Sequence, residues 1–206
     1  KKISWDAYVS NGGKGYTRVD LRMDKFSGKI SVLEVNAQCG LSEDENYTSI
    51  GAILRYSNKS FTQMVIEIIN DAIENGKSIC IYGDYDCDGI TSTVVLYSYL
   101  DCLGANVSYY IPERAEGYGM NSDAIKKLSE EGIELIITVD NGISAIEESE
   151  LIEELGMELI ITDHHQPSEK LPKATAIINP HQKDCSSPFK NLCGAGVVLK
   201  LIAALD

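Results

Sequence analysis

From residue 76 to the end of the chain, short apolar runs alternate with longer segments of helical periodicity. Five runs rich in Ile, Val and Leu are bounded by turn residues and predict β-strands at 79–82, 106–111, 135–139, 158–162 and 176–178. The segments between and after them predict helices at 91–103, 121–131, 145–155 and 194–205. Strands that alternate with helices of this length are typical of an α/β protein with a doubly wound parallel sheet.

The first 74 residues follow a different pattern. Residues 15–23 and 30–36 alternate apolar and polar positions, which predicts two strands joined by a turn. Residues 60–74 carry the apolar stripe of an amphipathic helix. We therefore expect a small α+β domain over residues 1–74 and the α/β domain over residues 75–206, with the helix at 60–74 able to belong to either.

The composition is that of an ordinary globular protein. Of the 206 residues, 44% are hydrophobic and 24% are charged, so the chain can bury a sizeable core. No apolar run approaches the roughly 20 residues needed to span a bilayer, and the first residues do not read as a secretory signal. The six cysteines form no Cys-x-x-Cys pair, which favours a reducing cytoplasm over a disulfide framework or a zinc site.

Acidic charge is concentrated in the second domain. Residues 1–74 contain nine Lys and Arg against ten Asp and Glu, residues 75–206 contain nine against 21, and the chain has a net charge of −13. Part of the excess is a row of glutamates on the expected helix at 145–155, which is typical of a solvated face. Such a domain lacks the basic surface of a general nucleic-acid binder, so a bound polyanion must be held by metal ions and a few local cations.

Carboxylates and imidazoles follow three of the expected strands. They lie in the segments Gly83-Asp-Tyr-Asp-Cys-Asp-Gly89, Val139-Asp-Asn-Gly142 and Thr162-Asp-His-His165. Because the carboxyl ends of parallel strands line one crevice, we expect these side chains to converge there. Oxygen ligands with one or two imidazoles suit Mn²⁺ or Mg²⁺, and several shared carboxylates suit two ions. The alternative is that Asp-Gly and Asn-Gly only form turns, but three acidic clusters after three strands favour a metal site.

A near-repeat supports this convergence. The segment Glu134-Leu-Ile-Ile-Thr-Val-Asp140-Asn141 is echoed one β-α unit later by Glu158-Leu-Ile-Ile-Thr-Asp163-His164-His165. The polar ends of both segments should therefore fall on the same edge of the sheet, which predicts that Asp140 and His164 share a site.

The ordered motifs of the second domain resemble the Asp-His-His (DHH) phosphoesterase family, in its RecJ-like branch. The likeness covers roughly residues 70–206 and includes the three acidic segments, Tyr110-Ile-Pro-Glu-Arg114, Glu116-Gly-Tyr-Gly119 and Cys193-Gly-Ala-Gly196. The resemblance implies hydrolysis of phosphodiester or related phosphoanhydride bonds with two Mn²⁺ or Mg²⁺ ions. For the RecJ-like branch it implies a 5′–3′ exonuclease specific for single-stranded DNA, with single strands or short oligonucleotides as partners.

Carried over position by position, the resemblance assigns roles to the acids and imidazoles. It implies four metal ligands, namely Asp86, Asp88, His164 and Asp140, the last of which is expected to bridge the ions. It implies a catalytic set beside the metals, in which Asp84 is close to the ions and His165 contacts the scissile phosphate or orients a ligand. Asp163 completes this set as the partner that holds an imidazole tautomer.

Two further residues are candidates for substrate contact. Arg114 is the one arginine in residues 75–206, and a guanidinium can clamp a phosphate through two hydrogen bonds. The alternative for Arg114 is a surface salt bridge with Glu113 or Glu116. Tyr118 lies between two glycines and can stack a base, although turn chemistry explains the glycines equally well.

The resemblance also implies parts that follow this segment in the family. A further metal-ligand aspartate and a small substrate-binding domain come after the Cys193-Gly-Ala-Gly196 helix, beyond Asp206. The first residue is Lys rather than Met, so we expect a piece of a longer protein whose α/β domain is incomplete at its C-terminal end.

Residues 3–72 resemble the carboxy-terminal end of an ATP-grasp ligase, most closely the D-alanine–D-alanine ligases. The likeness rests on the segments Gly15-Tyr-Thr-Arg-Val-Asp20, Leu33-Glu-Val-Asn36 and Gly40-Leu-Ser42. It implies an Mg-ATP site formed by Asp20, Glu34 and Asn36, with Arg18 stabilising an acyl-phosphate intermediate. Glu34 and Asn36 are two apart on a strand and so share a face, with Asp20 opposite. The alternative is a polar face on an exposed hairpin.

The leading hypothesis is therefore a metal-dependent, RecJ-like exonuclease in the cytoplasm. A hydrolase of dinucleotides or short oligonucleotides is the alternative within the same class, and the acidic charge favours it. Fragments of an ATP-dependent D-alanine–D-alanine ligase and an inactive binding remnant are the alternatives from other classes.

Overall fold

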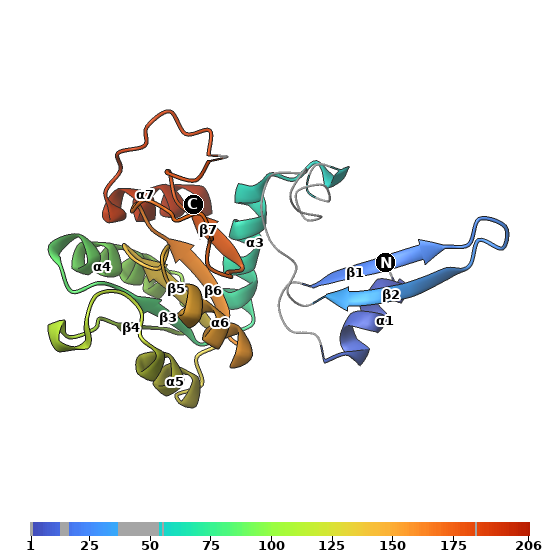
Figure 1. Cartoon of the computed structure of the whole chain (residues 1–206), viewed down its shortest axis with the longest axis horizontal. Helices are drawn as coiled ribbons and strands as arrows, with labels where there is room; N and C mark the ends of the chain where they lie inside the picture. The colour runs from blue at the N-terminus through green and yellow to red at the C-terminus, as the bar shows by residue number, and fades with distance from the viewer. Residues whose placement is uncertain (1, 13–16, 37–53, 55, 184) are drawn as a thin grey trace. The chain divides into compact units, whose positions relative to one another are not determined.

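The protein is described by a computed structural model over residues 2–12, 17–36, 54, 56–183 and 185–206 (Figure 1). The chain divides into two compact units, Lys1–Lys59 and Ser60–Asp206. The break precedes helix α3 (Phe61–Glu74), so this helix belongs to the second unit. In the described part of the chain, no helix has the length and apolar character needed to cross a membrane.

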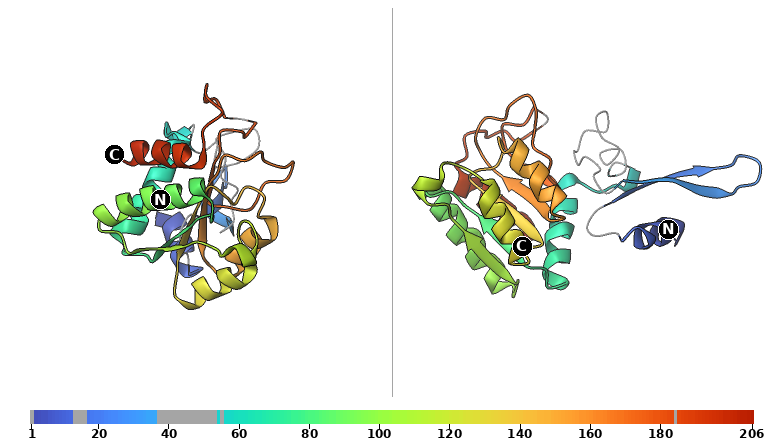
Figure 2. Two further views of the ribbon diagram at one scale, coloured as in Figure 1. Left: turned by 90° about the vertical axis from the view of Figure 1, so that its left-hand side faces the viewer. Right: turned by 60° about the horizontal axis from the view of Figure 1, so that its bottom comes forward.

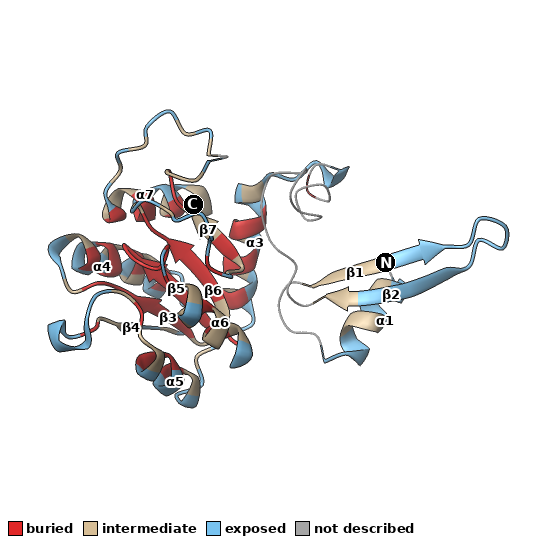
Figure 3. Ribbon diagram, viewed as in Figure 1, coloured by how far each residue is buried: buried red, intermediate tan, exposed pale blue. Residues whose placement is uncertain are grey.

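The first unit contains a β-hairpin and a helix. Strands β1 (Arg18–Met23) and β2 (Ile30–Asn36) pair antiparallel, which confirms the two strands expected there. The turn between them is closed by Asp24, whose carboxylate accepts hydrogen bonds from the backbone N–H groups of Phe26 and Ser27. Helix α1 (Lys2–Ser10) was not expected from the sequence. None of these three elements contains a buried residue, so the hairpin has no core of its own (Figure 3).

The second unit is built on a five-stranded parallel sheet, as the alternation of apolar runs predicted. The strand order is β4-β3-β5-β6-β7, and all neighbouring pairs are parallel. The strands are β3 (Ile79–Tyr82), β4 (Val107–Tyr110), β5 (Leu135–Val139), β6 (Glu158–Thr162) and β7 (Ala176–Ile178). The order reverses between β3 and β5, and in doubly wound folds ligands bind in the crevice at such a switch point.

Helices cover both faces of this sheet (Figure 2). Helices α3, α4 (Cys87–Cys102) and α7 (Gly194–Leu205) lie on one face, and α5 (Ser122–Glu130) and α6 (Ile146–Glu154) lie on the other. Strands β3 and β5 are buried along their whole length, which explains why they are continuous apolar runs rather than alternating ones (Figure 3). The core is therefore formed by both faces of the central strands.

Helix α4 starts four residues earlier than the sequence pattern suggested. Asp86 is its N-cap, and its carboxylate accepts a hydrogen bond from the backbone N–H of Gly89 at 2.9 Å. Gly89 is required there, because a Cβ atom at this position would lie 2.6 Å from the backbone oxygen of Asp84. The early start places Asp88 inside the first turn of the helix, next to the carboxyl end of β3.

Candidate metal centre

Asp84 and Asp86, the first two acids after β3, belong to the same cluster of carboxylates but differ in burial. Asp84 is 1% exposed, and its Oδ1 atom has no hydrogen-bond partner among the described residues. Asp86 is exposed at the start of α4. Asp84, Asp86 and Asp140 offer carboxylate oxygens that all lie within 4.8 Å of one another. A buried carboxylate without a partner is costly, and a bound cation would remove that cost.

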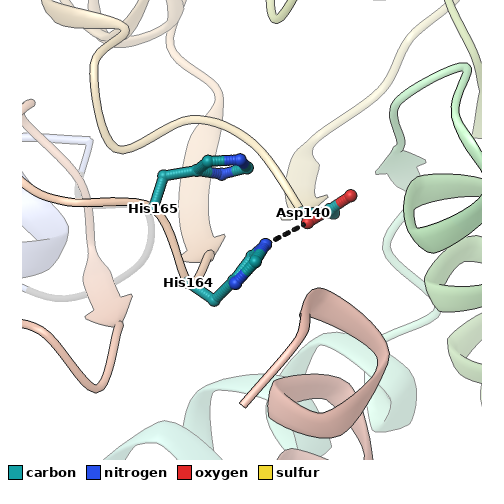
Figure 4. Close-up of side chains that lie close together, drawn as sticks. All are labelled: Asp140, His164 and His165. Atoms are coloured by element: carbon teal, nitrogen blue, oxygen red, sulfur yellow. Dashed lines mark ion pairs between the residues drawn. The ribbon is translucent and has the colours of Figure 1, made fainter. Parts of the chain in front are cut away.

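Asp140 follows β5 and is the centre of the arrangement. It is 2% exposed and adopts φ = 64°, a left-handed conformation that is uncommon for a residue other than glycine. Its Oδ1 atom lies 3.1 Å from Nε2 of His164 but forms no hydrogen bond of good geometry in the described part of the chain (Figure 4). Burial, followed by the charges of Asp88 and Asp86, raises the pKa of Asp140 to about 7.

The two imidazoles come from the loop after β6 and lie beside Asp140 (Figure 4). Asp140, His164 and His165 offer ligand atoms that lie within 4.8 Å of one another, so they form a second group able to hold a metal ion. The near-repeat in the sequence predicted that Asp140 and His164 share a site, and the 3.1 Å separation of their side chains confirms it.

The carboxylate of Asp163 fixes the conformation of this loop through hydrogen bonds. Its Oδ1 atom accepts hydrogen bonds from the backbone N–H groups of His164 and His165 and lies 2.7 Å from Nδ1 of His165. Its Oδ2 atom accepts a hydrogen bond from the backbone N–H of Ile143 at 2.9 Å. Burial acts to lower the pKa of His165, but the hydrogen bond to Asp163 and its charge outweigh burial and raise it. Asp163 therefore lies where the resemblance placed it, behind an imidazole.

Asp88 is bound differently from the other acids. Its two oxygens accept hydrogen bonds from the first backbone N–H groups of α7, from Gly194 at 2.6 Å and from Ala195 at 3.0 Å. Burial acts to raise the pKa of Asp88, but these bonds outweigh it and the pKa is lowered. His164 Nε2 is 3.7 Å from Asp88 Oδ2. Among the described residues, one of the two groups able to hold an ion contains Asp84 and neither contains Asp88. Asp88 instead joins the start of α7 to the centre through these backbone hydrogen bonds.

Arg114 lies on the short 3₁₀ helix η1 (Arg114–Glu116), and the alternative considered for it, a salt bridge with Glu113 or Glu116, does not form. Its guanidinium lies over the ring of Tyr85, 5.5 Å from the centroid. Glu116 instead accepts a hydrogen bond from the hydroxyl of Tyr110 at 2.8 Å. Arg114 thus remains close to the acidic segment, with its charge held by an aromatic face.

A contact of Tyr118 with the site was missed by the sequence reasoning. The hydroxyl of Tyr118 lies 3.3 Å from both ring nitrogens of His165 and 3.4 Å from the backbone oxygen of Asp140. No local sequence signal reports this contact, because 47 residues separate Tyr118 from His165.

The residues of the expected Mg-ATP site lie together on the hairpin of the first unit. Asp20 pairs with Glu34 and Arg18 pairs with Asn36 in the register of β1 and β2. Arg18 also forms an ion pair with Asp20, with 3.0 Å between Nη2 and Oδ2. The register places Asp20 opposite Glu34, and two acids in this arrangement repel each other unless a cation lies between them.

Residues 78–206 match the family model described as the N-terminal domain of the DHH family. The chain belongs to the DHH family. The single-stranded-DNA-specific exonuclease RecJ of Bacillus subtilis (strain 168) is 51% identical over 138 residues, which are 66% of this chain and 18% of the relative. The RecJ exonuclease of Escherichia coli (strain K12) is 40% identical over 166 residues, 80% of this chain and 29% of the relative.

Solved structures agree with this membership. A crystal structure of exonuclease RecJ bound to manganese is similar with a TM-score of 0.64 and 35% identity, and the match covers 70% of this chain and 37% of that one. The chain spans less than a third of the length of the two curated relatives described above. These matches support the RecJ-like resemblance, whereas the ATP-grasp resemblance of residues 3–72 stays a prediction.

Proposed function

We propose that this chain carries the metal-binding part of a phosphodiesterase, and that it acts as a 5′–3′ exonuclease on single-stranded DNA. The observation that carries the proposal is the pair of buried carboxylates, Asp84 and Asp140, each with an oxygen that has no hydrogen-bond partner among the described residues. Both face a cluster that also offers Asp86 and two imidazoles. The relatives at 40–51% identity are named as single-stranded-DNA-specific exonucleases, which gives the substrate class.

The residues present fit divalent ions of the Mn²⁺ or Mg²⁺ kind. Carboxylate oxygens with one or two imidazoles are the donor set these ions accept. Asp140 belongs to both groups, so it would be a ligand common to both. The ligands would be Asp84, Asp86, Asp140, His164 and His165, with Asp88 at the edge of the set. Two ions held there would lower the pKa of a bound water and stabilise the negative charge that develops on the phosphate.

The chain's own residues prepare this site for a phosphodiester. Asp163 fixes the ring of His165 through Nδ1, so that Nε2, which also lies 3.3 Å from the hydroxyl of Tyr118, is the ring nitrogen that would serve the cluster or a bound phosphate. Arg114 supplies a cation on an otherwise acidic rim, and its stacking on Tyr85 restricts the plane of the guanidinium. We propose that Arg114 binds a phosphate of the strand.

The place of action that we propose is the cytoplasm. In the part of the chain that the structure describes, all five cysteines are free thiols, which is the expected state in a reducing compartment. Residues 75–206 carry a net charge of −12, from nine basic and 21 acidic residues. This charge does not attract a long polyanion, so we propose short oligonucleotides, which carry fewer phosphates, as an additional substrate class.

The experiment is hydrolysis of a 5′-labelled single strand in the presence of Mn²⁺. The proposal expects release of single nucleotides from the 5′ end by the wild type and loss of that activity in Asp140→Ala. Glu147→Ala, an exposed glutamate on α6, is the matched control and should retain it. A wild type that cuts dinucleotides but not longer strands would support the short-substrate alternative, and ATP turnover with D-alanine that Glu34→Ala abolishes would support the ligase.

A further inference from the structure

The loop between η1 and α5 holds Tyr118 in a defined conformation. The two glycines that flank it, Gly117 and Gly119, have φ of 96° and 84°. A Cβ atom at either position would meet no atom within 4 Å, so the glycines are required by the backbone conformation and not by close packing. A turn would form without any contact of Tyr118 to the metal centre, but the side chain of Tyr118 lies against His165.

One end of Tyr118 is anchored at the metal centre. Its hydroxyl lies 3.3 Å from the ring nitrogens of His165 and 3.4 Å from the backbone oxygen of Asp140, and its ring meets the imidazole edge to face, with centroids 5.9 Å apart. A phenolic hydroxyl at these distances can donate a hydrogen bond to a ring nitrogen or to the backbone oxygen.

The other end of Tyr118 is open to solvent. The residue is 58% exposed although its hydroxyl is held, so the ring presents an immobilised apolar surface beside the carboxylates. A single exposed aromatic residue is common on protein surfaces. What distinguishes this one is that it is fixed at its polar end, next to the place where a phosphate would be bound.

The 3₁₀ helix η1, which precedes this loop, carries a cation. Arg114, four residues before Tyr118, is stacked on Tyr85 at 5.5 Å. Proteins that bind single strands combine cations that follow the backbone with aromatic side chains on which bases stack. The other side chains around the site are mostly acidic and repel the phosphates of a nucleotide. An uncharged aromatic ring can attract the base by stacking without adding to this repulsion.

We propose that the ring of Tyr118 stacks on the nucleobase of the nucleotide adjacent to the phosphate held at the metal centre. This inference rests on the proposed function, since it requires a nucleic-acid strand at that centre. It makes Tyr118 a specificity residue, which distinguishes a strand with bases from a bare sugar-phosphate chain. Its hydroxyl serves to keep the ring in place beside His165.

The test compares two single strands with the same backbone, one with normal bases and one with abasic tetrahydrofuran sites at the first positions. The variants are Tyr118→Leu, which removes the aromatic ring, and Tyr118→Phe, which keeps it. Tyr109→Leu is the matched control, because Tyr109 is 61% exposed and packs against Tyr97 on α4, outside the proposed binding loop. Circular dichroism and Mn²⁺ titration of each variant monitor the fold and the metal centre.

We expect the wild type to have a KM for the abasic strand roughly 5- to 150-fold higher than for the normal strand, as base–aromatic stacking energies imply. In Tyr118→Leu this ratio should fall close to one, and Tyr109→Leu should keep the wild-type ratio. Tyr118→Phe keeps the ring but loses its anchor, so its ratio should lie between that of Tyr118→Leu and that of the wild type. A wild-type ratio of one, or an unchanged ratio in Tyr118→Leu, would overturn the inference and leave the proposed function intact. A wild type that neither cuts nor binds either strand with Mn²⁺ would overturn the proposed function, and the inference with it.

Discussion

Gly194→Ala tests whether helix α7 is docked on the metal centre as the structure shows. Gly194 is buried at the first position of α7, where its backbone N–H donates to Asp88. We expect this one added methyl group to destabilise the second unit and to weaken Mn²⁺ binding, although the residue is not itself a metal ligand.

The magnitude follows from the space around Gly194. A Cβ atom there would lie 2.5 Å from Oδ1 and 2.6 Å from Cβ of Asp140, which is closer than such atoms approach in folded proteins. Asp140 is 2% exposed and has little room to move, so α7 must retreat. Overpacking of this kind costs about 1–3 kcal/mol. The better helix propensity of alanine recovers at most about 1 kcal/mol.

Retreat of α7 has a second cost. It lengthens the hydrogen bonds from Gly194 and Ala195 to Asp88, and hydrogen bonds to a charged group are worth about 1.5–3 kcal/mol each. A partial loss of these bonds roughly balances the gain in helix propensity. The net expectation is a decrease in the free energy of unfolding of about 1–3 kcal/mol.

Urea unfolding followed by far-ultraviolet circular dichroism measures this change. Most helices of the described chain lie in the second unit, whereas the one tryptophan, Trp5, lies in the first and its fluorescence reports that unit separately. Gly196→Ala is the control, because its Cβ would lie 3.1 Å from the flexible end of Leu192, and we expect it to be neutral or slightly stabilising. Equal midpoints for Gly194→Ala and wild type would refute the docking argument.

Two further predictions concern the acids. Asp163→Asn leaves the backbone N–H of Ile143 facing either an amide NH₂ or a weaker acceptor, so the free energy of unfolding should fall by about 1–3 kcal/mol. The pKa of His165, measured by NMR, should also fall, because the charge of Asp163 raises it in the wild type. An unchanged His165 titration would contradict the assigned contact. In metal-free protein the pKa of Asp140 is raised to about 7 from an ordinary value of 3.8, so between these values the folded state keeps a proton that the unfolded state releases. Stability should therefore decrease as pH rises through this window, less steeply in Asp140→Asn, and Mn²⁺ should raise the melting temperature more at the alkaline than at the acid end. A metal-free melting temperature that rises across the window in wild type and variant alike would show that Asp140 is not held as described.

The sheet and most of the site could be predicted because the relevant signals are local. Buried parallel strands such as Ile79–Tyr82 and Leu135–Val139 are continuous apolar runs, and the residues that follow them must lie at one edge of the sheet. The near-repeat predicted that Asp140 and His164 lie together, and their side chains are 3.1 Å apart. The helix start at Cys87 differed from the prediction, because a capping aspartate outweighs the apolar pattern in setting where a helix begins.

The contacts that could not be predicted are long-range. Asp88 meets the start of α7 across 106 residues, and Tyr118 meets His165 across 47, so neither contact leaves a trace in sequence spacing. They alter the interpretation of the site. Asp88 is held by backbone donors. Asp84, which the resemblance placed beside the ions, is a buried carboxylate with an oxygen that has no hydrogen-bond partner in the described structure.

Titration of metal-free protein with Mn²⁺, followed by electron paramagnetic resonance, measures how many ions the carboxylates and imidazoles hold. We expect two Mn²⁺ ions per chain in the wild type and in Glu147→Ala. Asp140→Ala should lose both ions, because Asp140 belongs to both ligand groups. Binding of the same number of ions with the same affinity by Asp140→Ala would contradict the assignment of this sheet edge as the metal centre.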